Sequence, residues 1–352
     1  MGRVRILTLD NKSIPSPGIL AAQAKFVEDG HIASADTLNV RWPSTLSGSP
    51  PLDELIERLK KSDYDLCIVR TPKNFPNNVN EMDRVIEALG SRRVVLWDGD
   101  AWGKGKPMPM QYSWWASVSS QVFTVADSPQ SAAWKRLGAN DVRLILHVYD
   151  HVVFKEAENR PPSPDKRGGI VLIGNNLRRL PVLGGLPGSG GRMKLAKFLH
   201  HSSQLPTRIA GRGWPKRFQA LPVATRDQVP LIRDMGVSVN WDHFPDYHQY
   251  ASDRLAISLL AGRPHVTTSH PGTSWMPGAS EGLFCLGSPT GVWNKALEIL
   301  DGDPQRRVEI GQSAWSWSRR RMSTVEAERY LLRMSGVDLP RSAFSTWRNL
   351  EM

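Results

Sequence analysis

Glycines, arginines and other polar residues follow several segments of the second half of the chain that are typical of buried strands. They lie in IVLIGNNLRR (170–179), RIAGRGW (208–214), SVNWDHFPDYHQYASDR (238–254) and TTSHPGTS (267–274). Ligands of open parallel sheets bind beyond the carboxyl ends of the strands. There, glycine lets backbone amides approach a diphosphate, a helix start supplies a favourable dipole, and arginine adds a fixed cation. The candidate phosphate-binding residues are Gly174, Asn175, Arg178, Gly211, Arg212, Asn240, His243, Asp253, Arg254 and Gly272.

Each of these loops has a second explanation, because glycines after strands are common in α/β domains for steric reasons alone. The convergence of several such loops in one domain favours phosphate binding. His243, His248 and His270 fall in the same loops. Their spacing does not suit a metal site, so we expect hydrogen bonding to phosphate and no metal requirement.

A pair of carboxylates follows a strand of the first half, in LWDGDAWGKGK. Asp98 and Asp100 would lie at a strand end that faces the other domain, where a carboxylate can take a proton from an acceptor hydroxyl. The sequence therefore predicts Asp98 or Asp100 as a catalytic base and Arg254 as the catalytic cation. In the alternative interpretation, Asp98 caps a turn and Asp100 is solvated, as is common in Asp-Gly-Asp segments.

Strand and helix patterns alternate through both halves of the chain. VRILTLD, YDLCIVR and RRVVLWDGD are separated by amphipathic segments such as LDELIERLKK, and a second series begins at IVLIGNN. This alternation predicts parallel sheets covered on both faces. A length of 352 residues also exceeds what one core supports. We expect an α/β protein of two Rossmann-like, doubly wound domains that face each other across a cleft.

The domain limits are predicted from composition. Residues 157–169 contain three prolines and end in Gly-Gly, which is typical of a linker. Residues 1–156 would form an N-terminal domain and 170–335 a C-terminal domain, followed by a tail at 336–352. Two helices are predicted beyond Asp303, and the last of them could cross back to the first domain.

The positive charge of the chain is concentrated. The formal net charge is +11, and residues 161–220 hold eleven Lys or Arg against a single acid, Asp165. A second basic cluster, Arg319, Arg320 and Arg321, follows two tryptophans. A clustered excess favours a polyanionic partner, whereas an even spread would argue only for solubility. Tryptophans near these cations could stack on a nucleic-acid strand, a base or a sugar ring.

Other features indicate a soluble cytoplasmic protein. No apolar run approaches the roughly 20 residues of a membrane span, and no signal-peptide pattern precedes the first strand. The two cysteines, Cys67 and Cys285, are predicted to be small core residues. The oligomeric state is left open.

The second half of the chain resembles a known family. A glycine-rich strand end, AGRGW, a strand ending in Asn, an Arg before a helix that closes in A-G-x-P, and a Val-Thr-Thr strand are similar to the nucleotide-sugar domain of GT-B glycosyltransferases. The nearest branch is the spore-maturation-type or family-4-like enzymes, over residues 140–335. The resemblance implies a nucleotide diphosphate sugar in the C-terminal domain and an acceptor in the N-terminal one. One position departs: Ile257 stands where the family carries a Glu that contacts the donor ribose. Asp253 or Glu281 would then replace that contact.

Two classes of function remain. In the first, the protein transfers a sugar from a nucleotide sugar, with a UDP-sugar as the leading donor. The acceptor could be a hydroxymethylated base in DNA, which the basic excess favours, or a cell-surface glycan, a small metabolite or a peptide. In the second, the protein binds nucleic acid on the same fold without catalysis, as the missing Glu at position 257 allows.

Overall fold

The computed structural model describes residues 3–11, 15–41, 50–164, 168–177 and 185–351. A first sheet has the order β2-β1-β3-β4-β5-β6, and every pairing in it is parallel. Its strands are β1 (Arg5–Asp10), β2 (Ser34–Asn39), β3 (Leu66–Arg70), β4 (Arg93–Asp98), β5 (Gln121–Thr124) and β6 (Val142–Leu144). A second parallel sheet has the order β11-β10-β9-β7-β8. It contains β7 (Ile170–Ile173), β8 (Thr207–Ala210), β9 (Val237–Val239), β10 (His265–Thr268) and β11 (Leu283–Leu286).

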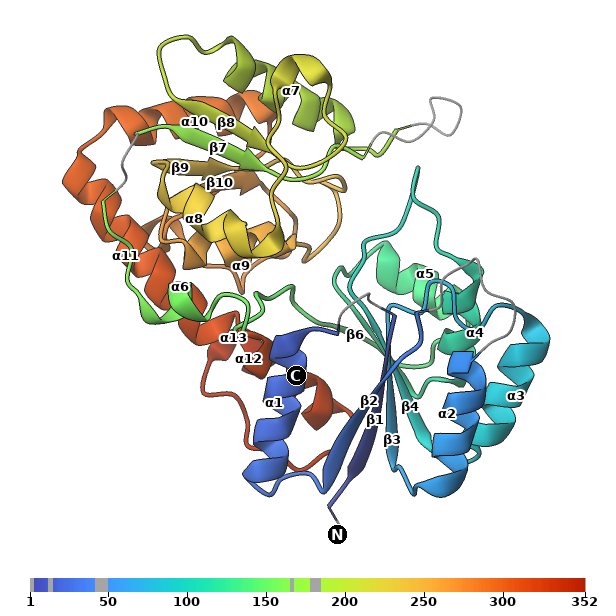
Figure 1. Ribbon diagram of the computed structural model, residues 1–352. Coiled ribbons are helices and arrows are strands. Elements are labelled where there is room, and N and C mark those ends of the chain that lie inside the picture. The colour runs from blue at the N-terminus through green and yellow to red at the C-terminus, as the bar shows by residue number, and fades with distance from the viewer. Residues whose placement is uncertain (1–2, 12–14, 42–49, 165–167, 178–184, 352) are drawn as a thin grey trace.

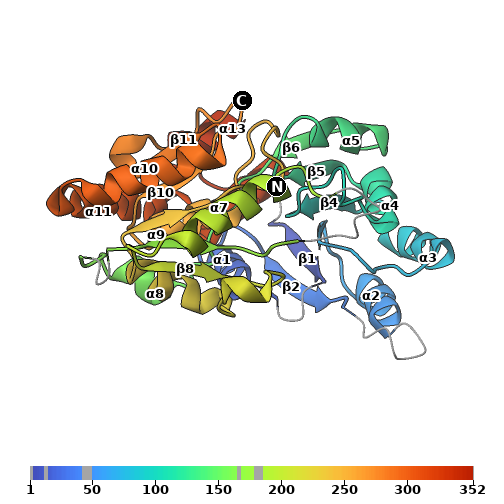
Figure 2. The ribbon, with the colours of Figure 1, turned by 90° about the horizontal axis from the view of Figure 1, so that it is seen from above.

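Helices cover the faces of each sheet (Figure 1). Those of the first body are α1 (Pro17–Glu28), α2 (Pro50–Lys61), α3 (Val79–Leu89), α4 (Met110–Val118) and α5 (Gln130–Arg136). The short α6 (Lys155–Asn159) precedes the second sheet, which has α7 (Ser189–His201), α8 (Gln228–Arg233), α9 (Asp253–Leu260), α10 (Pro289–Asp301) and α11 (Pro304–Arg321). From above, α2 and α3 lie on the outer side of the first body and α11 on that of the second (Figure 2). The predicted α/β architecture of two doubly wound sheets is confirmed.

Local sequence signals explain where these elements begin and end. Ser16 caps α1, with its hydroxyl accepting from the amide of Ile19, and Pro17 stands in the first turn. Gly30 has a φ of +75°, which ends this helical segment at a conformation that suits glycine. Every residue of β3, β7 and β10 is buried, as expected for strands covered on both faces.

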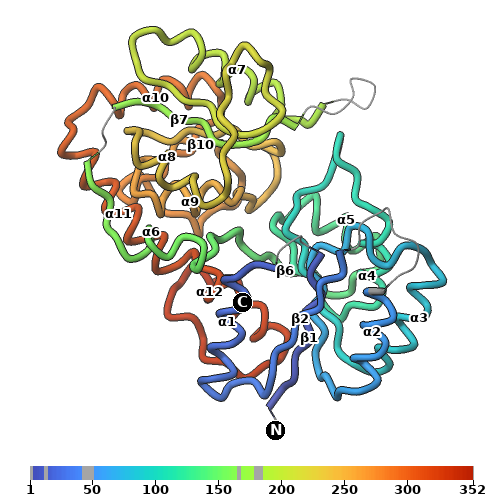
Figure 3. The backbone as a smooth tube through the Cα atoms, in the orientation of Figure 1, coloured from blue at the N-terminus to red at the C-terminus, as the bar shows by residue number. Residues whose placement is uncertain are grey.

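The chain passes from the first body to the second after β6 and returns after α11 (Figure 3). α12 (Thr324–Met334) packs against α1, and α13 (Ser345–Glu351) packs on α12. The predicted return of the C-terminal helices to the first domain is therefore confirmed, and the tail at 336–352 contributes α13. The division of the chain at 157–169 stays a prediction, although α6 already occupies residues 155–159.

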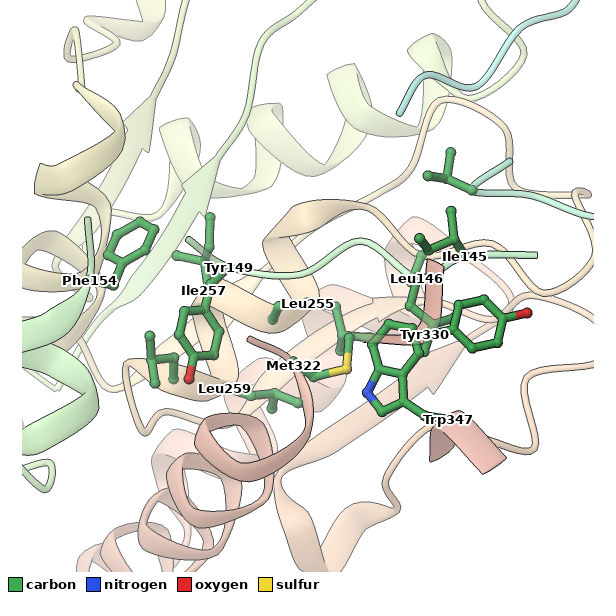
Figure 4. Packing of buried hydrophobic residues seen from close by; sticks show 14 of the residues in the cluster. Ile145, Leu146, Tyr149, Phe154, Leu255, Ile257, Leu259, Met322, Tyr330 and Trp347 are labelled. Atoms are coloured by element: carbon green, nitrogen blue, oxygen red, sulfur yellow. The ribbon is translucent and has the colours of Figure 1, made fainter. Parts of the chain in front are cut away.

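One hydrophobic cluster joins the two bodies (Figure 4). The segment after β6, here called the crossover (residues 145–154), inserts Ile145, Leu146 and Tyr149 into it. α9 contributes Leu255 and Ile257, and the C-terminal helices add their own apolar side chains. Burial of such side chains stabilises by roughly 1.5–3 kcal/mol each. The two bodies are thus packed through a shared core as well as linked by the chain.

Two further observations concern the sequence predictions. Cys67 is buried in β3, as predicted, but Cys285 is exposed, because β11 is an edge strand. No helix in the described part of the chain combines the length and the apolar character that a membrane span requires.

A buried ion pair ties α12 to the first sheet. Arg70 at the end of β3 donates to Glu328 of α12, and each side chain is 2% exposed. Gln23 of α1 donates to the other oxygen of Glu328 at 2.6 Å and to Thr8 of β1 at 3.1 Å. The returning helix is therefore fixed by polar contacts as well as by apolar packing.

We predict that Glu328→Gln and Arg70→Met each lower the free energy of unfolding by about 3–5 kcal/mol, because each leaves one buried charge without its partner. Urea unfolding followed by circular dichroism measures this. Arg84→Ala is the control, since it removes an exposed pair with Asp53 and should cost less than about 1 kcal/mol. Equal losses for the buried and the exposed pair would contradict the role of Arg70 and Glu328.

Candidate functional site

Two cavities lie where the bodies face each other. The smaller, of about 230 Å³, is lined by Asp100 and Lys106 of the first body and by Asn175, His243 and Arg254 of the second. The larger, of about 690 Å³, extends along α1 and the crossover. Both are lined by loops after the carboxyl ends of strands, where ligands of open α/β sheets bind.

Two arginines converge on Gly174, directly after β7. A Cβ built on Gly174 would lie 2.8 Å from Nε of Arg254 and 3.4 Å from Nη1 of Arg192, so any side chain there would displace Arg254. The φ of Gly174, +157°, lies at the edge of the region that favours glycine. Arg254, in the first turn of α9, donates to the carbonyl of Ile173 at 3.0 Å and to Asp253 at 3.2 Å.

Arg192, which the sequence analysis missed, is 1% exposed. Its guanidinium donates to the carbonyl of Trp241 at 2.7 Å, to that of Asn175 at 2.7 Å and to Oδ1 of Asn240 at 3.1 Å. Burial and the nearby charge of Arg254 lower the pKa of Arg192 to about 10. The two cations therefore repel each other, which makes the space beside them favourable for an anion.

A buried carboxylate stabilises this cationic group. Asn240 donates to Asp242 at 2.8 Å, and His270 lies 3.0 Å from the other carboxylate oxygen. Burial alone would raise the pKa of Asp242, but His270 and the charge of Arg192 hold it well below its usual range. Asp242 therefore remains ionised.

His243 supplies a neutral imidazole to the smaller cavity. Burial, followed by the charges of Arg192 and Arg254, lowers the pKa of His243 to about 3. Its Nε2 is buried and has no hydrogen-bond partner in the described ranges. His243 therefore lines the smaller cavity as an uncharged side chain.

Some of the remaining predicted phosphate-site residues lie beside Gly174 and Asn175, and others do not. Gly211 packs on the carbonyl of Gly174, and the amide of Arg212 donates to Asn175 at 2.9 Å, while the Arg212 side chain is exposed. Gly272 packs against His248 and lines neither cavity. Arg178 lies outside the described residues.

The two carboxylates of the first body have different environments. Asp98 is completely buried and accepts from Trp102 Nε1 at 2.8 Å and from Gln130 Nε2 at 3.3 Å. Burial, followed by the charge of Asp100, raises the pKa of Asp98 well above its usual range. Asp98 lines neither cavity, in contrast to the expectation that it faces the cleft, because its carboxylate is buried against Trp102 and Gln130.

Asp100 lines both cavities and is 26% exposed. It forms ion pairs with Lys73 at 2.7 Å and Lys106 at 2.8 Å. Burial alone would raise the pKa of Asp100, but the two ammonium groups outweigh it and lower the pKa. The carboxylate is therefore ionised, and the lysines engage both of its oxygens.

Of the two residues predicted to contact the donor ribose, Asp253 has a position that is compatible with this role and Glu281 does not. Asp253 lines both cavities, whereas Glu281 lines a separate hollow beside α11. Ile257 is 3% exposed and lines the larger cavity, where its side chain belongs to the shared core.

The bodies also touch at the rim of the cleft. Tyr247 donates to the carbonyl of Trp102, and His248 exchanges backbone hydrogen bonds with residues 127 and 128 at 3.0 and 2.9 Å. The loop after β9 thereby contacts both the phosphate-side residues and the first body.

Within the described residues, the Lys and Arg side chains of the two basic clusters do not line the two cavities. Lys197, Arg208, Lys216 and Arg217 are exposed on α7, on β8 and on the short helix after it. The second cluster lies at the end of α11, with Arg319 over the ring of Trp315 at 4.6 Å. No group of three or more His, Cys, Asp or Glu within the described ranges is arranged to hold a metal ion.

The chain matches no protein-family model, and no curated protein matches it in sequence. Its fold is similar to that of Anabaena HepE, crystallised with UDP and glucose, at 13% identity over 95% of this chain and 99% of that one, with a TM-score of 0.58. It is also similar to that of sucrose-phosphate synthase from Thermosynechococcus elongatus, at 12% identity over 95% of this chain and 98% of that one, with a TM-score of 0.56. T4 phage BGT, in complex with its UDP-glucose substrate, is similar at 11% identity over 96% of this chain and 100% of that one, with a TM-score of 0.56. At these identities the likeness establishes the fold, which is the GT-B architecture. The narrower resemblance to spore-maturation-type enzymes stays a prediction.

We predict that Gly174→Ala weakens anion binding, because the added methyl group displaces Arg254. Inorganic pyrophosphate should raise the melting temperature of the wild type, since a ligand at a hundred times its dissociation constant stabilises by about 2.7 kcal/mol. The variant should show a much smaller rise at the same concentration. Gly287→Ala is the control, because a Cβ there meets no atom within 4 Å. An unchanged rise in Gly174→Ala would argue against anion binding at this position.

Proposed function

We propose that this protein is a glycosyltransferase that moves a sugar from a nucleotide diphosphate sugar, with a UDP-sugar as the leading donor, to an acceptor hydroxyl. The observation that carries the proposal is the pair of guanidinium groups at Gly174, beside a cavity between two Rossmann-like bodies. The fold supports it, since HepE and T4 phage BGT were crystallised with UDP or UDP-glucose.

The chemistry follows from charge. When the bond between the sugar and the diphosphate breaks, negative charge builds up on the leaving oxygen, and preorganised cations stabilise that charge most in the transition state. In this proposal Arg254, which lines the smaller cavity, contacts the diphosphate. Arg192 donates to Asn175 and Asn240 and adds its charge. Asp253 is the proposed ribose contact, and His243 the neutral donor to phosphate.

On the acceptor side, Asp100 is the candidate of the two predicted carboxylates, because Asp98 lines neither cavity. Ionised Asp100 can accept a hydrogen bond from the acceptor hydroxyl and orient it toward the donor. In this proposal sugar transfer requires no metal ion, because the arginines balance the negative charge of the leaving diphosphate.

We predict that Arg254→Ala lowers the rate of donor turnover by about 100-fold or more, since single preorganised donors to a developing oxyanion contribute on that scale. Release of UDP from UDP-glucose, with and without candidate acceptors, measures it. Arg226→Ala, which removes an exposed arginine of the same body, should leave the rate unchanged. A folded Arg254→Ala variant with full turnover would remove this residue from the site. A wild type that releases no nucleotide from any donor would favour the non-catalytic alternative.

We further propose DNA with a hydroxymethylated base as the acceptor, and the observation that favours it is the exposed basic group on α7, β8 and the following turn. The sequence of residues 168–226 contains no Asp or Glu. Such a surface would neutralise phosphates, whereas the hydroxyl-bearing ring would enter the cavity beside Asp100. Cell-surface glycans, small metabolites and peptides are the other acceptor classes.

DNA binding should fall steeply with salt, because cations that neutralise phosphates release counterions. Lys216→Glu and Arg217→Glu should each weaken binding and reduce the salt slope by about one unit. The measurement is fluorescence anisotropy with unmodified duplex DNA across a salt series. Lys135→Glu, an exposed lysine on α5, is the matched control. Absent binding at low salt, with sugar transfer to small acceptors only, would overturn DNA as acceptor and leave the sugar-transfer proposal standing.

A further inference from the structure

One histidine lies where the two cavities meet. The residues that line both are Gly99, Asp100, His147 and Asp253. Among these four, only His147 belongs to the crossover that connects the bodies. A donor bound beside Arg254 and an acceptor bound in the larger cavity would meet at this junction.

The backbone around His147 is held firmly. Ile145 donates its amide to Thr124 of β5 at 2.8 Å, and Tyr149 donates to the carbonyl of Met322 at 2.9 Å. The flanking side chains of Ile145, Leu146 and Tyr149 are buried in the shared core (Figure 4). A side chain supported in this way is preorganised, as a group that transfers protons requires.

The imidazole of His147 is available for a new hydrogen bond. Neither ring nitrogen bonds to any residue that the structure describes, and the ring stands edge-on to Tyr250, with centroids 6.3 Å apart. In contrast, both carboxylate oxygens of Asp100 are engaged by lysines. Of the two groups, the imidazole is the better placed to accept a proton.

Charged groups surround this ring from both bodies. Asp100 faces it from the first body, Asp253 and Arg254 from α9, and Asp242 from the loop after β9. Lys106 and His243 complete the smaller cavity, and Asp150 and the Arg70–Glu328 pair the larger one. Burial lowers the pKa of His147 despite the opposing effect of Asp253 and Asp100. The ring is therefore neutral at pH 7, with one nitrogen able to accept a proton.

Building on the proposed glycosyltransferase function, we propose that His147 is the general base of a single-displacement reaction. Its unprotonated ring nitrogen takes the proton of the acceptor hydroxyl while that oxygen bonds to the anomeric carbon. The bond from this carbon to the diphosphate oxygen breaks, and its electron pair stays on the diphosphate beside Arg254. The sugar is transferred with inversion. Asp100 orients the acceptor and balances the imidazolium charge, so the proton-accepting role predicted for a carboxylate passes to His147.

Water serves as the acceptor in the test, so the natural acceptor need not be known. UDP release from UDP-glucose, UDP-N-acetylglucosamine and GDP-mannose is first screened with the wild type for the nucleotide released. With the best donor, His147→Ala should lower the rate at least about 100-fold, the scale of a positioned base. Added imidazole should restore part of it, and proton NMR should show the inverted anomer first. Asp100→Asn should reduce the rate less than His147→Ala.

The pH profile distinguishes proton transfer from a structural role. The wild-type rate should rise with pH as His147 loses its proton, with a midpoint below about 6.5, the ordinary value for histidine, and then level off. His147→Gln should lack this rise. His151→Ala, from the same crossover but bonded to Thr324 and outside both cavities, is the matched control and should keep the wild-type profile.

Several outcomes would overturn the assignment. They are a wild-type pH profile in His147→Gln, a retained anomeric configuration, or a loss of rate in His147→Ala that comes with loss of UDP binding by thermal shift. Each leaves sugar transfer itself intact, provided that the wild type releases nucleotide and Arg254→Ala does not. A wild type inactive with every donor would instead overturn the proposed function and this inference together.

Discussion

Two guanidinium groups, that of the buried Arg192 and that of the partly exposed Arg254, converge beside Gly174 and set the charge that the surrounding loops must balance. A Cβ on Gly174 would meet both Arg192 and Arg254, and burial, followed by the charge of Arg254, lowers the pKa of Arg192. In a medium of low dielectric such a pair is costly unless anions and carbonyl oxygens surround it. The loops after β7 and β9 supply those oxygens, and Asp242 and Asp253 supply the charge. A bound diphosphate would neutralise the remaining positive charge of Arg192 and Arg254, which is why we propose these residues as a ligand site.

α9 connects that charge arrangement to the rest of the molecule. Its first turn carries Asp253 and Arg254 into the cleft, while residues 255–260 are all buried. They pack on α11 and belong to the same hydrophobic cluster as the crossover and the C-terminal helices. The positions of Arg254 and of His147 therefore depend on the same apolar contacts. Because close-packed cores deform little, the distance between the donor-side and acceptor-side groups is maintained by packing far from the chemistry.

Periodicity in the sequence was sufficient to predict both sheets and the return of the last helix, since these depend on local patterns. It could not separate Asp98 from Asp100. Which of the two faces the cleft depends on Trp102 and Gln130, whose side chains reach Asp98 only in the folded layer. Arg192 was missed for a related reason, although a signal existed. It occupies the first position of the buried stripe 192, 195, 196 and 199 on α7, and a charged residue at an apolar position indicates a buried polar network. His147 had no local signal, because the crossover becomes a cleft wall only when both bodies are in place.

The isoleucine at position 257 is consistent with this arrangement. A glutamate there would place a carboxylate among Tyr149, Phe154 and Leu255, in a core that offers apolar contacts. Asp253 lies one turn earlier on α9, at the polar end of the helix, where it already pairs with Arg254 and lines both cavities. Asp253 and Ile257 are four residues apart and lie on the same helical face, so the acid occupies the first turn and the next turn is free for packing. Under the proposed function, Asp253 in the first turn of α9 contacts the donor ribose, and the following turn packs in the same apolar cluster as the crossover without burying a charge.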